Sequence, residues 1–232
     1  MKKEDLVRTL QEQLHAVQSE RQGAKRDPAL LAARIALKQF QSQRLAGTHA
    51  DLLAAPNSRE AALFFLEELY GAHDLSQRDA DLERIIPTMQ RLLPVNALQT
   101  ITEAIVLDAL SERLDTAMAR ALGTQFTPDD YVAAYRACTT APDRTRQLAL
   151  VQALGMSLCE LVRIPFLNAT LHMMRGPAKL AGLGDLQQFL ERGFTAFKRM
   201  KQAEQFVTTI VGREQRAMEN IYAGTSAPFD VA

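Results

Sequence analysis

The chain has 232 residues, of which 47% are hydrophobic and 23% charged, a balance typical of globular proteins and not of disordered chains. Lys and Arg together number 27, as do Asp and Glu, so the net charge gives no reason to expect a nucleic acid or another polyanion as partner. The longest charge-free run has thirteen residues, whereas a membrane span needs about 20. The start of the chain has no apolar signal core, and the two cysteines lack the spacing of a metal site. We therefore expect a reduced, cytoplasmic protein without membrane contact.

Helical periodicity begins at the first residues. Leucines at positions 6, 10 and 14 recur at a helical interval and predict a first helix at about residues 3–20. Asp27 followed by Pro28 is typical of an N-cap and a first helical position. The pattern after it predicts one long helix that ends at about Leu53.

The next two helices carry start and stop signals. Asn57 or Ser58 is the expected cap of the first, and Gly71 is its expected C-terminal stop. In the second, Ser76 and Asp79 have the spacing of a capping box, with acidic residues in the first turn, where the helix dipole favours them.

Further helix starts follow in the second half of the chain. Thr127 with Pro128, and Pro142 with Asp143, repeat the combination of a capping residue, a proline and an acid. Asp185 is the expected cap of a later helix. No alternating run between turn residues predicts a strand. The fold class is therefore all-α.

The domain prediction is one helical bundle of about eight to nine helices over residues 1–223. Pro87 and Pro165 interrupt helical patterns and predict kinks. Residues 175–184 are expected to form a loop with at most one helical turn, and residues 224–232 a flexible tail. Short connections without a Gly-, Ser- or Pro-rich linker favour a single domain.

The charges are distributed unevenly along the chain. Residues 59–130 contain thirteen acidic and six basic residues, whereas the segments before and after them have an excess of bases. The acidic middle segment could attract the basic ends within the fold, or it could present an acidic face to solvent. We favour attraction within the fold.

Within this segment, Asp108, Glu112 and Asp115 are spaced to share one helix face. An apolar stripe between residues 107 and 121 lies roughly opposite, so the spacing favours an exposed acidic face. The alternative is Mg²⁺-dependent diphosphate chemistry, because acidic helix faces can hold Mg²⁺ in all-helical prenyl-transferring enzymes. Those enzymes use paired clusters on two facing helices, a pattern that this sequence lacks.

The very apolar window IPFLNATLHMM contains polar residues that could line a pocket. If residues 159–176 form one helix, most of its polar side chains share an arc of about 120°. These candidate ligand-binding residues are Glu160, Arg163, Asn168, His172 and Arg175.

Two interpretations of this window remain open. In the first, Glu160 pairs with Arg163, Pro165 leaves the carbonyl of Leu161 free, and the helix lines a small polar cavity of a ligand sensor or enzyme, with His172 as acid or base. In the second, the same residues form a solvated stripe at a helix edge. The second interpretation is favoured.

No catalytic, cofactor-binding or metal motif is predicted. The Glu-x-x-His pattern of helical di-iron sites occurs once, at Glu12 and His15, in a polar helix. The first 58 residues show neither the basic cluster nor the tight turn of a helix-turn-helix reading head. The glycines before Asp185 lack the Walker lysine and the preceding strand.

The leading functional hypothesis is a non-enzymatic protein that self-associates, or that binds a protein partner or a small apolar ligand. Residues 64–69 are apolar on more than one helix face, and phenylalanines recur through residues 189–210. The eight methionines and ten phenylalanines provide the adaptable apolar side chains that such contacts use. A homo-oligomer is expected.

Two segments resemble uncharacterised bacterial all-helical proteins. They are FFLEELYG…DLSQRDADLERIIP, residues 64–87, and MRGPAKLAGLGDLQQFLERGFTAF, residues 174–197. The resemblance covers about a fifth of the chain. It implies an all-helical fold and no particular activity.

Overall fold

The structure is a computed structural model that describes residues 2–68 and 76–231, and every regular element in these two ranges is a helix. The all-α prediction is confirmed for these residues, although the helices exceed the predicted eight to nine. They are α1 (Lys3–Arg26), α2 (Pro28–Thr48), α3 (Ala50–Ala54), α4 (Arg59–Glu68), α5 (Ser76–Leu92), α6 (Val95–Leu122), α7 (Pro128–Cys138), α8 (Ala141–Leu161), α9 (Leu167–Met173), α10 (Arg175–Leu180), α11 (Gly184–Lys198) and α12 (Ala203–Ala223).

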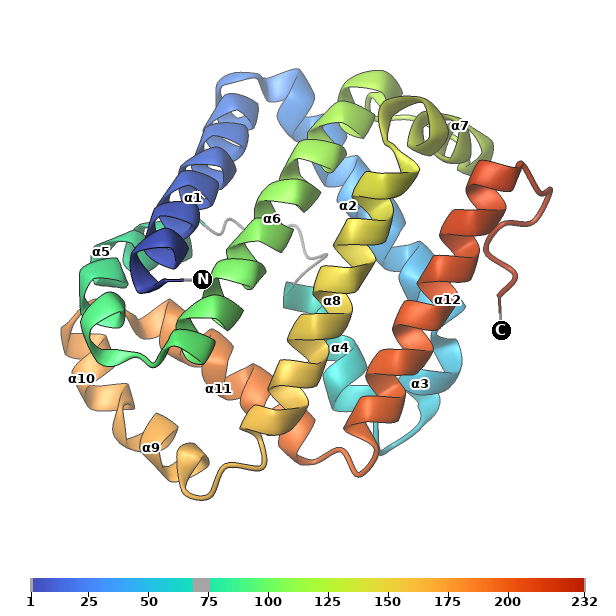
Figure 1. Cartoon of the computed structure of the whole chain (residues 1–232). Coiled ribbons are helices and arrows are strands. Elements are labelled where there is room, and N and C mark those ends of the chain that lie inside the picture. Colours follow the sequence, from blue (N-terminus) through green and yellow to red (C-terminus); the bar gives the residue numbers. More distant parts are fainter. Residues whose placement is uncertain (1, 69–75, 232) are drawn as a thin grey trace.

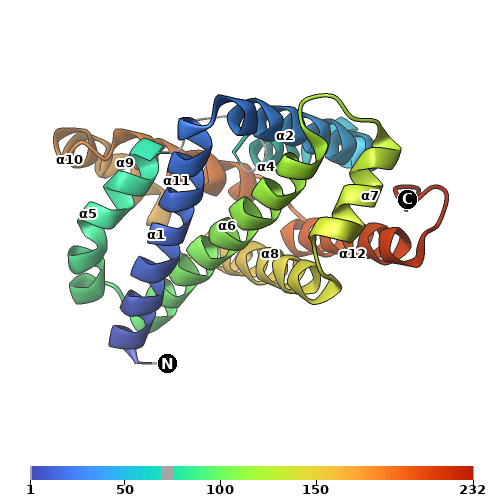
Figure 2. The same cartoon turned by 90° about the horizontal axis from the view of Figure 1, so that it is seen from above.

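Helix α6 is the central element of the molecule. It packs against α1, α2, α7 and α8, so that neighbours lie on several of its sides. Figures 1 and 2 show it passing between α1 and α8 in both views. A helix in this position has no wide solvent-facing side, so the acidic residues in its middle lie against other helices.

Two apolar clusters lie along α6. The first joins its N-terminal half, at Leu98 and Ile105, to the leucines of α1 and to apolar side chains of α5. The second joins its C-terminal end, at Met118, to α2 and α7, with Tyr131 fully buried. Asp108, Glu112 and Asp115 of α6 occupy the stretch between these two clusters.

The third cluster joins α4, α8, α11 and α12 around Phe197 and Phe206. Helices α8 and α12 run side by side (Figure 1), and Gly155 of α8 lies directly against Val207 of α12. A Cβ atom built on Gly155 would lie 2.7 Å from Val207 Cγ1. The close approach of these two helices therefore requires glycine at position 155.

The capping predictions were right at some helix starts and wrong at others. Asp27 accepts backbone hydrogen bonds as the N-cap of α2, and Thr127 forms the predicted capping box at the start of α7. Asp185 does not cap α11, because Leu183 occupies the N-cap position. The predicted stop at Gly71 lies outside the described residues.

The predicted helix bounds need three corrections. Helix α1 continues to Arg26, and the long helix predicted for residues 28–53 divides at His49 into α2 and α3. Pro87 does not change a helix bound, because it lies inside α5, which continues to Leu92. The predicted helix over residues 159–176 does not exist as one element, because α8 ends at Leu161.

The chain after α8 turns through Pro165 and then forms the short helices α9 and α10, separated by Met174 alone. The predicted loop at 175–184 thus contains the helix α10. In both views α9 and α10 lie at one edge of the molecule, away from α7, α12 and the C-terminus (Figures 1 and 2).

The segment predicted to be a loose tail packs against the helices. Phe229 lies beside Tyr131 and under the guanidinium of Arg44, and Val231 is buried. Its backbone is held as well, since Arg216 donates to the carbonyl of Val231 at 2.9 Å. Across the described residues, no helix has both the length and the apolar composition required to cross a bilayer.

Candidate functional site

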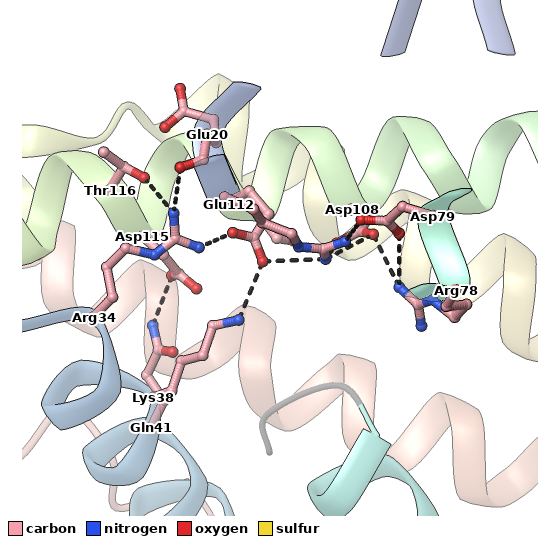
Figure 3. Close-up of polar contacts among 12 residues, drawn as sticks. Glu20, Arg34, Lys38, Gln41, Arg78, Asp79, Asp108, Glu112, Asp115 and Thr116 are labelled. Atoms are coloured by element: carbon pink, nitrogen blue, oxygen red, sulfur yellow. Dashed lines mark hydrogen bonds and ion pairs between the residues drawn. The ribbon is translucent and has the colours of Figure 1, made fainter. Parts of the chain in front are cut away.

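The largest cluster of buried charges surrounds the middle of α6 (Figure 3). It joins carboxylates of α5 and α6 to basic side chains of α1, α2 and α5. We call it the charged belt. Its members are Arg21, Arg34, Lys38, Arg78, Asp79, Asp108, Glu112 and Asp115.

Glu112 is the centre of the charged belt, and only 3% of its surface is exposed. Its carboxylate accepts hydrogen bonds from Lys38 Nζ at 3.1 Å and from an Arg21 guanidinium nitrogen at 3.3 Å. It also forms an ion pair with Arg34. One carboxylate of α6 therefore holds one basic residue of α1 and two of α2.

Arg21 connects α1 to α5 as well as to α6. Its guanidinium donates to both carboxylate oxygens of Asp108, at 2.8 and 3.0 Å, and contacts the buried carboxylate of Asp79. Arg78 of α5 reaches the same Asp108 at 3.2 Å. The contact between Arg21 and Asp108 joins residues that are 87 positions apart in the sequence.

The remaining contacts fix α2 against α6. Gln41 donates to Asp115 at 3.0 Å, and Arg34 donates to the hydroxyl of Thr116 at 2.9 Å. Arg34 also reaches the backbone carbonyl of Glu20, at 3.4 Å. Figure 3 shows these side chains converging from α1, α2 and α5 on one stretch of α6.

Burial governs the ionisation of the charged belt. Desolvation lowers the pKa of Lys38 and of Arg34, since their charged forms lose water. Desolvation also raises the pKa of Asp79, against the opposing effect of Arg21. Four acids and four bases nevertheless balance one another, so the charged belt can remain ionised without leaving an uncompensated charge inside the fold.

The prediction of an exposed acidic face was wrong. Glu112 and Asp115 are buried and Asp108 is mostly covered, because basic and amide side chains of α1 and α2 lie against them. The same contacts occupy the carboxylates that the Mg²⁺ alternative would use. Within residues 2–68 and 76–231, no group of three or more His, Cys, Asp or Glu side chains is placed to hold a metal ion.

Sequence reasoning favoured attraction between the acidic middle segment and the basic ends, but it did not identify the basic residues of the charged belt, although a signal was present. Arg21 continues the helical spacing of the apolar residues Leu14 and Val17 on the buried face of α1. In the same way, Arg34 and Gln41 occupy buried positions on α2. A basic residue that falls in register with an apolar stripe indicates a buried ion pair.

The candidate residues of the 160–175 window do not surround a common cavity. Glu160 is exposed, and Arg163 pairs with Glu204 of α12 at 2.7 Å instead of with Glu160. The carbonyl of Leu161, predicted to be free, accepts a hydrogen bond from the backbone N–H of Ile164.

The other three candidates lie on α9 and α10. His172 is exposed, and its Nδ1 lies 2.9 Å from the backbone carbonyl of the half-buried Asn168. Arg175 donates to Glu191 of α11 at 2.7 and 2.8 Å, and this hydrogen bond lowers the pKa of Glu191 to about 2. The polar residues of the window thus make local contacts in separate elements.

The apolar residues of the same window face outward. Between Leu161 and Leu180, large apolar side chains are exposed over the end of α8, the following turn, α9 and α10. We call this surface the apolar segment. Its members and their exposed fractions are Leu161 (37%), Ile164 (50%), Phe166 (84%), Met173 (78%), Met174 (47%) and Leu180 (92%).

Phe166 is also unusual in its backbone. It is the one described residue other than glycine with positive φ, at 63°. This left-handed conformation costs a residue with a Cβ atom about 1–2 kcal/mol. The fold therefore holds a phenylalanine that is 84% exposed in an unfavourable backbone conformation.

Two open clefts lie outside the charged belt. One, of about 450 Å³, lies between α4 and α11 and is lined by Phe64, Arg175 and Arg199 among others. The other, of about 320 Å³, lies between the end of α2 and the C-terminal residues and is lined by Arg44 and Phe229. Arg175 is thus the only predicted site residue that lines either of these clefts.

Beside the second cleft lies a smaller buried cluster that sequence reasoning also missed. Glu214 of α12 accepts hydrogen bonds from Arg44 at 2.6 Å, and its Oε1 lies 3.0 Å from His49 Nε2. Although burial favours the protonated carboxyl, Arg44 and His49 hold the pKa of Glu214 below its ordinary value. The cluster joins the end of α2 to α12.

A family described as a domain of unknown function (DUF8198) matches residues 20–228, which is most of the chain, so the chain belongs to this family. No curated protein and no solved structure matches it. The expected resemblance to an uncharacterised family is therefore confirmed, and it brings no activity with it.

Proposed function

We propose that this protein is an interaction module: a helical body, fixed internally by the charged belt, that binds another protein through the apolar segment. The observation that carries the proposal is the exposure of six large apolar side chains within 20 consecutive residues. Exposed apolar side chains concentrated in one segment are a feature of interaction sites in folded proteins.

The charged belt supports this assignment by its balance. Its carboxylates are engaged by Arg21, Arg34, Lys38, Arg78 and Gln41, so these groups pair with one another inside the fold. Neither of the two clefts opens on the belt's central residue, Glu112. We therefore assign the charged belt to architecture and the apolar segment to binding.

Site-specific photo-crosslinking in the native cells tests the proposal. A photoreactive phenylalanine analogue at position 166 should give adducts of discrete mass that contain a protein. The same analogue at Leu92, which is 71% exposed at the end of α5, is the matched control and should give none. Adducts with lipid alone, or equal labelling at both positions, would contradict the proposal.

Small-ligand binding is a second candidate, supported by one observation. Arg175 lines the cleft of about 450 Å³ between α4 and α11, whose floor includes Phe64. Native mass spectrometry of protein purified without added ligand tests it. A co-purifying mass that is lost in Arg175→Ala and retained in Arg163→Ala would support this function, and the absence of any such mass would contradict it.

A further inference from the structure

We infer that the partner of the apolar segment is a second copy of this chain, bound symmetrically through Phe166, Met173 and Leu180. This inference rests on the proposed function, because it identifies the partner of the same surface. Four observations support it: the spacing of the three residues, the area that they and their neighbours expose, the charge of the chain, and the position of the segment.

The three most exposed apolar residues of the segment are seven residues apart, at positions 166, 173 and 180. From Leu167 to Leu180 the chain is helical except at Met174, whose backbone angles (φ −75°, ψ −9°) remain in the right-handed helical region, whereas Phe166 is the left-handed residue just before this stretch. Residues seven apart occupy nearly the same side of a helix, the spacing with which helices pair along an apolar seam. Met173 and Leu180 therefore lie on nearly the same side of the helical stretch, and Phe166 precedes it; we call these three residues the stripe.

This spacing is compatible with two-fold symmetry. In a symmetric dimer the same patch is used by both copies, so each contact occurs twice. Because Met173 is the midpoint of the stripe, an antiparallel arrangement places it against the partner's Met173 and places Phe166 against the partner's Leu180.

The exposed area is close to what a stable interface requires. With about 180 Å² for each fully exposed large apolar residue, the six residues of the apolar segment expose on the order of 700 Å². A standard protein–protein interface buries about 800 Å² on each partner. The largest apolar patch of a typical monomer is about 300–600 Å².

Charge favours an identical partner. The formal net charge of the chain is zero, so two copies approach without net repulsion. The ion pairs Arg163–Glu204 and Arg175–Glu191 flank the stripe with both signs of charge, so its rim does not repel a copy of itself. The apolar composition of the stripe also matches homodimer interfaces, which are more apolar than transient ones.

The position of the segment leaves room for a second copy. Helices α9 and α10 lie at one edge of the molecule in both views, and α7, α12 and the C-terminus lie toward the opposite side (Figures 1 and 2). Two copies can therefore meet at α9 and α10 without contact between their central α6 helices.

Sedimentation equilibrium on the purified full chain tests the inference. We expect a dimer of the 25.8 kDa chain, and a dimer dissociation constant at least tenfold larger in Leu180→Ser, because the dimer loses this side chain twice and truncation of an anchoring interface residue commonly costs more than 1 kcal/mol. Leu92→Ser, which removes an exposed leucine outside the apolar segment, should dimerise as the wild type does. Circular dichroism should show both variants equally helical.

A disulfide test examines the geometry separately. In a background without Cys138 and Cys159, Met173→Cys should form an intermolecular disulfide under mild oxidation, because the symmetry axis passes beside this residue. Leu92→Cys is the control and should remain monomeric on a non-reducing gel. If the Met173→Cys variant forms its disulfide no faster than the control does, the antiparallel arrangement is overturned.

The failure of this inference can be told from the failure of the proposed function. A chain that is monomeric at tens of micromolar overturns the dimer. If position 166 then still crosslinks to a different protein in cells, the apolar segment binds a heterologous partner and the proposed function stands. If position 166 crosslinks to no protein, both are overturned.

Discussion

The charged belt and the apolar segment are opposites in composition and in environment. In the first, charged side chains are buried, and in the second, apolar side chains are exposed. Glu112 is a carboxylate in the most enclosed part of the molecule, and Phe166 is a phenylalanine with most of its surface in water. The difference teaches that periodicity describes the sides of a helix relative to one another. Whether a side is covered depends on which other helices reach it.

The burial of side chains by neighbouring helices has a different physical basis in the two regions. Around α6, basic residues of α1 and α2 come within ion-pair distance of the acids, and their mutual attraction offsets the loss of water. Around α9 and α10, α11 supplies contacts on one side only, and the apolar side chains remain outside. The predictions below test this contrast, from the largest expected effect to the smallest.

Removal of the central carboxylate of the charged belt should have the largest effect. Glu112→Ala leaves Arg21, Arg34 and Lys38 buried without a shared carboxylate, so we expect the free energy of unfolding to fall by about 3–5 kcal/mol. Urea unfolding at neutral pH measures it. Glu103→Ala on the same helix loses only a local hydrogen bond to Gln99 and should cost less than about 0.5 kcal/mol. Similar losses in the two variants would show that the charged belt is not the source of the effect.

Truncation of the phenylalanine in the apolar segment should raise the free energy of unfolding instead of lowering it. Phe166→Gly removes an exposed side chain and relieves a left-handed backbone, so we expect the isolated monomer to gain about 1 kcal/mol. Phe197→Ala, in the core between α4 and α11, should lose about 3–5 kcal/mol. Denaturant titrations at concentrations below the dimer dissociation constant measure both. A loss of stability in Phe166→Gly would mean that Phe166 packs within its own chain.

An exposed ion pair beside the apolar segment should contribute little. Arg163 and Glu204 lie 2.7 Å apart, but both side chains are more than half exposed, so Arg163→Ala should cost between 0 and about 1 kcal/mol. The cost should shrink further in 1 M salt, because solvent screens exposed charges. Thermal unfolding at low and high salt checks this. A salt-independent loss above 2 kcal/mol would place Arg163 in a buried network like the charged belt.

The smallest effects should appear in the titration of two acids, one in the charged belt and one on α11 beside the apolar segment. The pKa of Asp79 is raised by burial, so its contribution to stability is present below its ordinary value of 3.8 and is lost as the pH rises through the raised pKa. The hydrogen bond from Arg175 lowers the pKa of Glu191, so its contribution is present above 4.5 and is lost as the pH falls toward about 2.

Carboxyl chemical shifts followed by NMR from pH 2 to 8 measure both pKa values. Asp79→Asn and Glu191→Gln identify the two signals and serve as controls. Shifts of the two pKa values in the same direction would contradict the contrast between the two regions.

Much of the fold was predictable from local signals. The helix of residues 128–138 was predicted from Thr127, Pro128 and the acid after them, because a capping box requires only neighbours in the chain. An interruption at Pro165 was predicted, but the end of α8 four residues earlier, at Leu161, was not, because the helical pattern continues past it. Of the candidate site, the sequence identified the acids of α6 but not their burial, since the partners of Glu112 lie 74 or more residues away.

The sequence by itself determined the helical class, several caps and the presence of an acidic middle segment between basic ends. Only the tertiary structure decided that Arg21, Arg34 and Lys38 would meet those acids, and that six large apolar side chains between Leu161 and Leu180 would remain exposed. The physical reason is the range of the interactions. Caps and periodicity act within one or two helical turns, whereas burial depends on the packing of helices that are distant in the sequence.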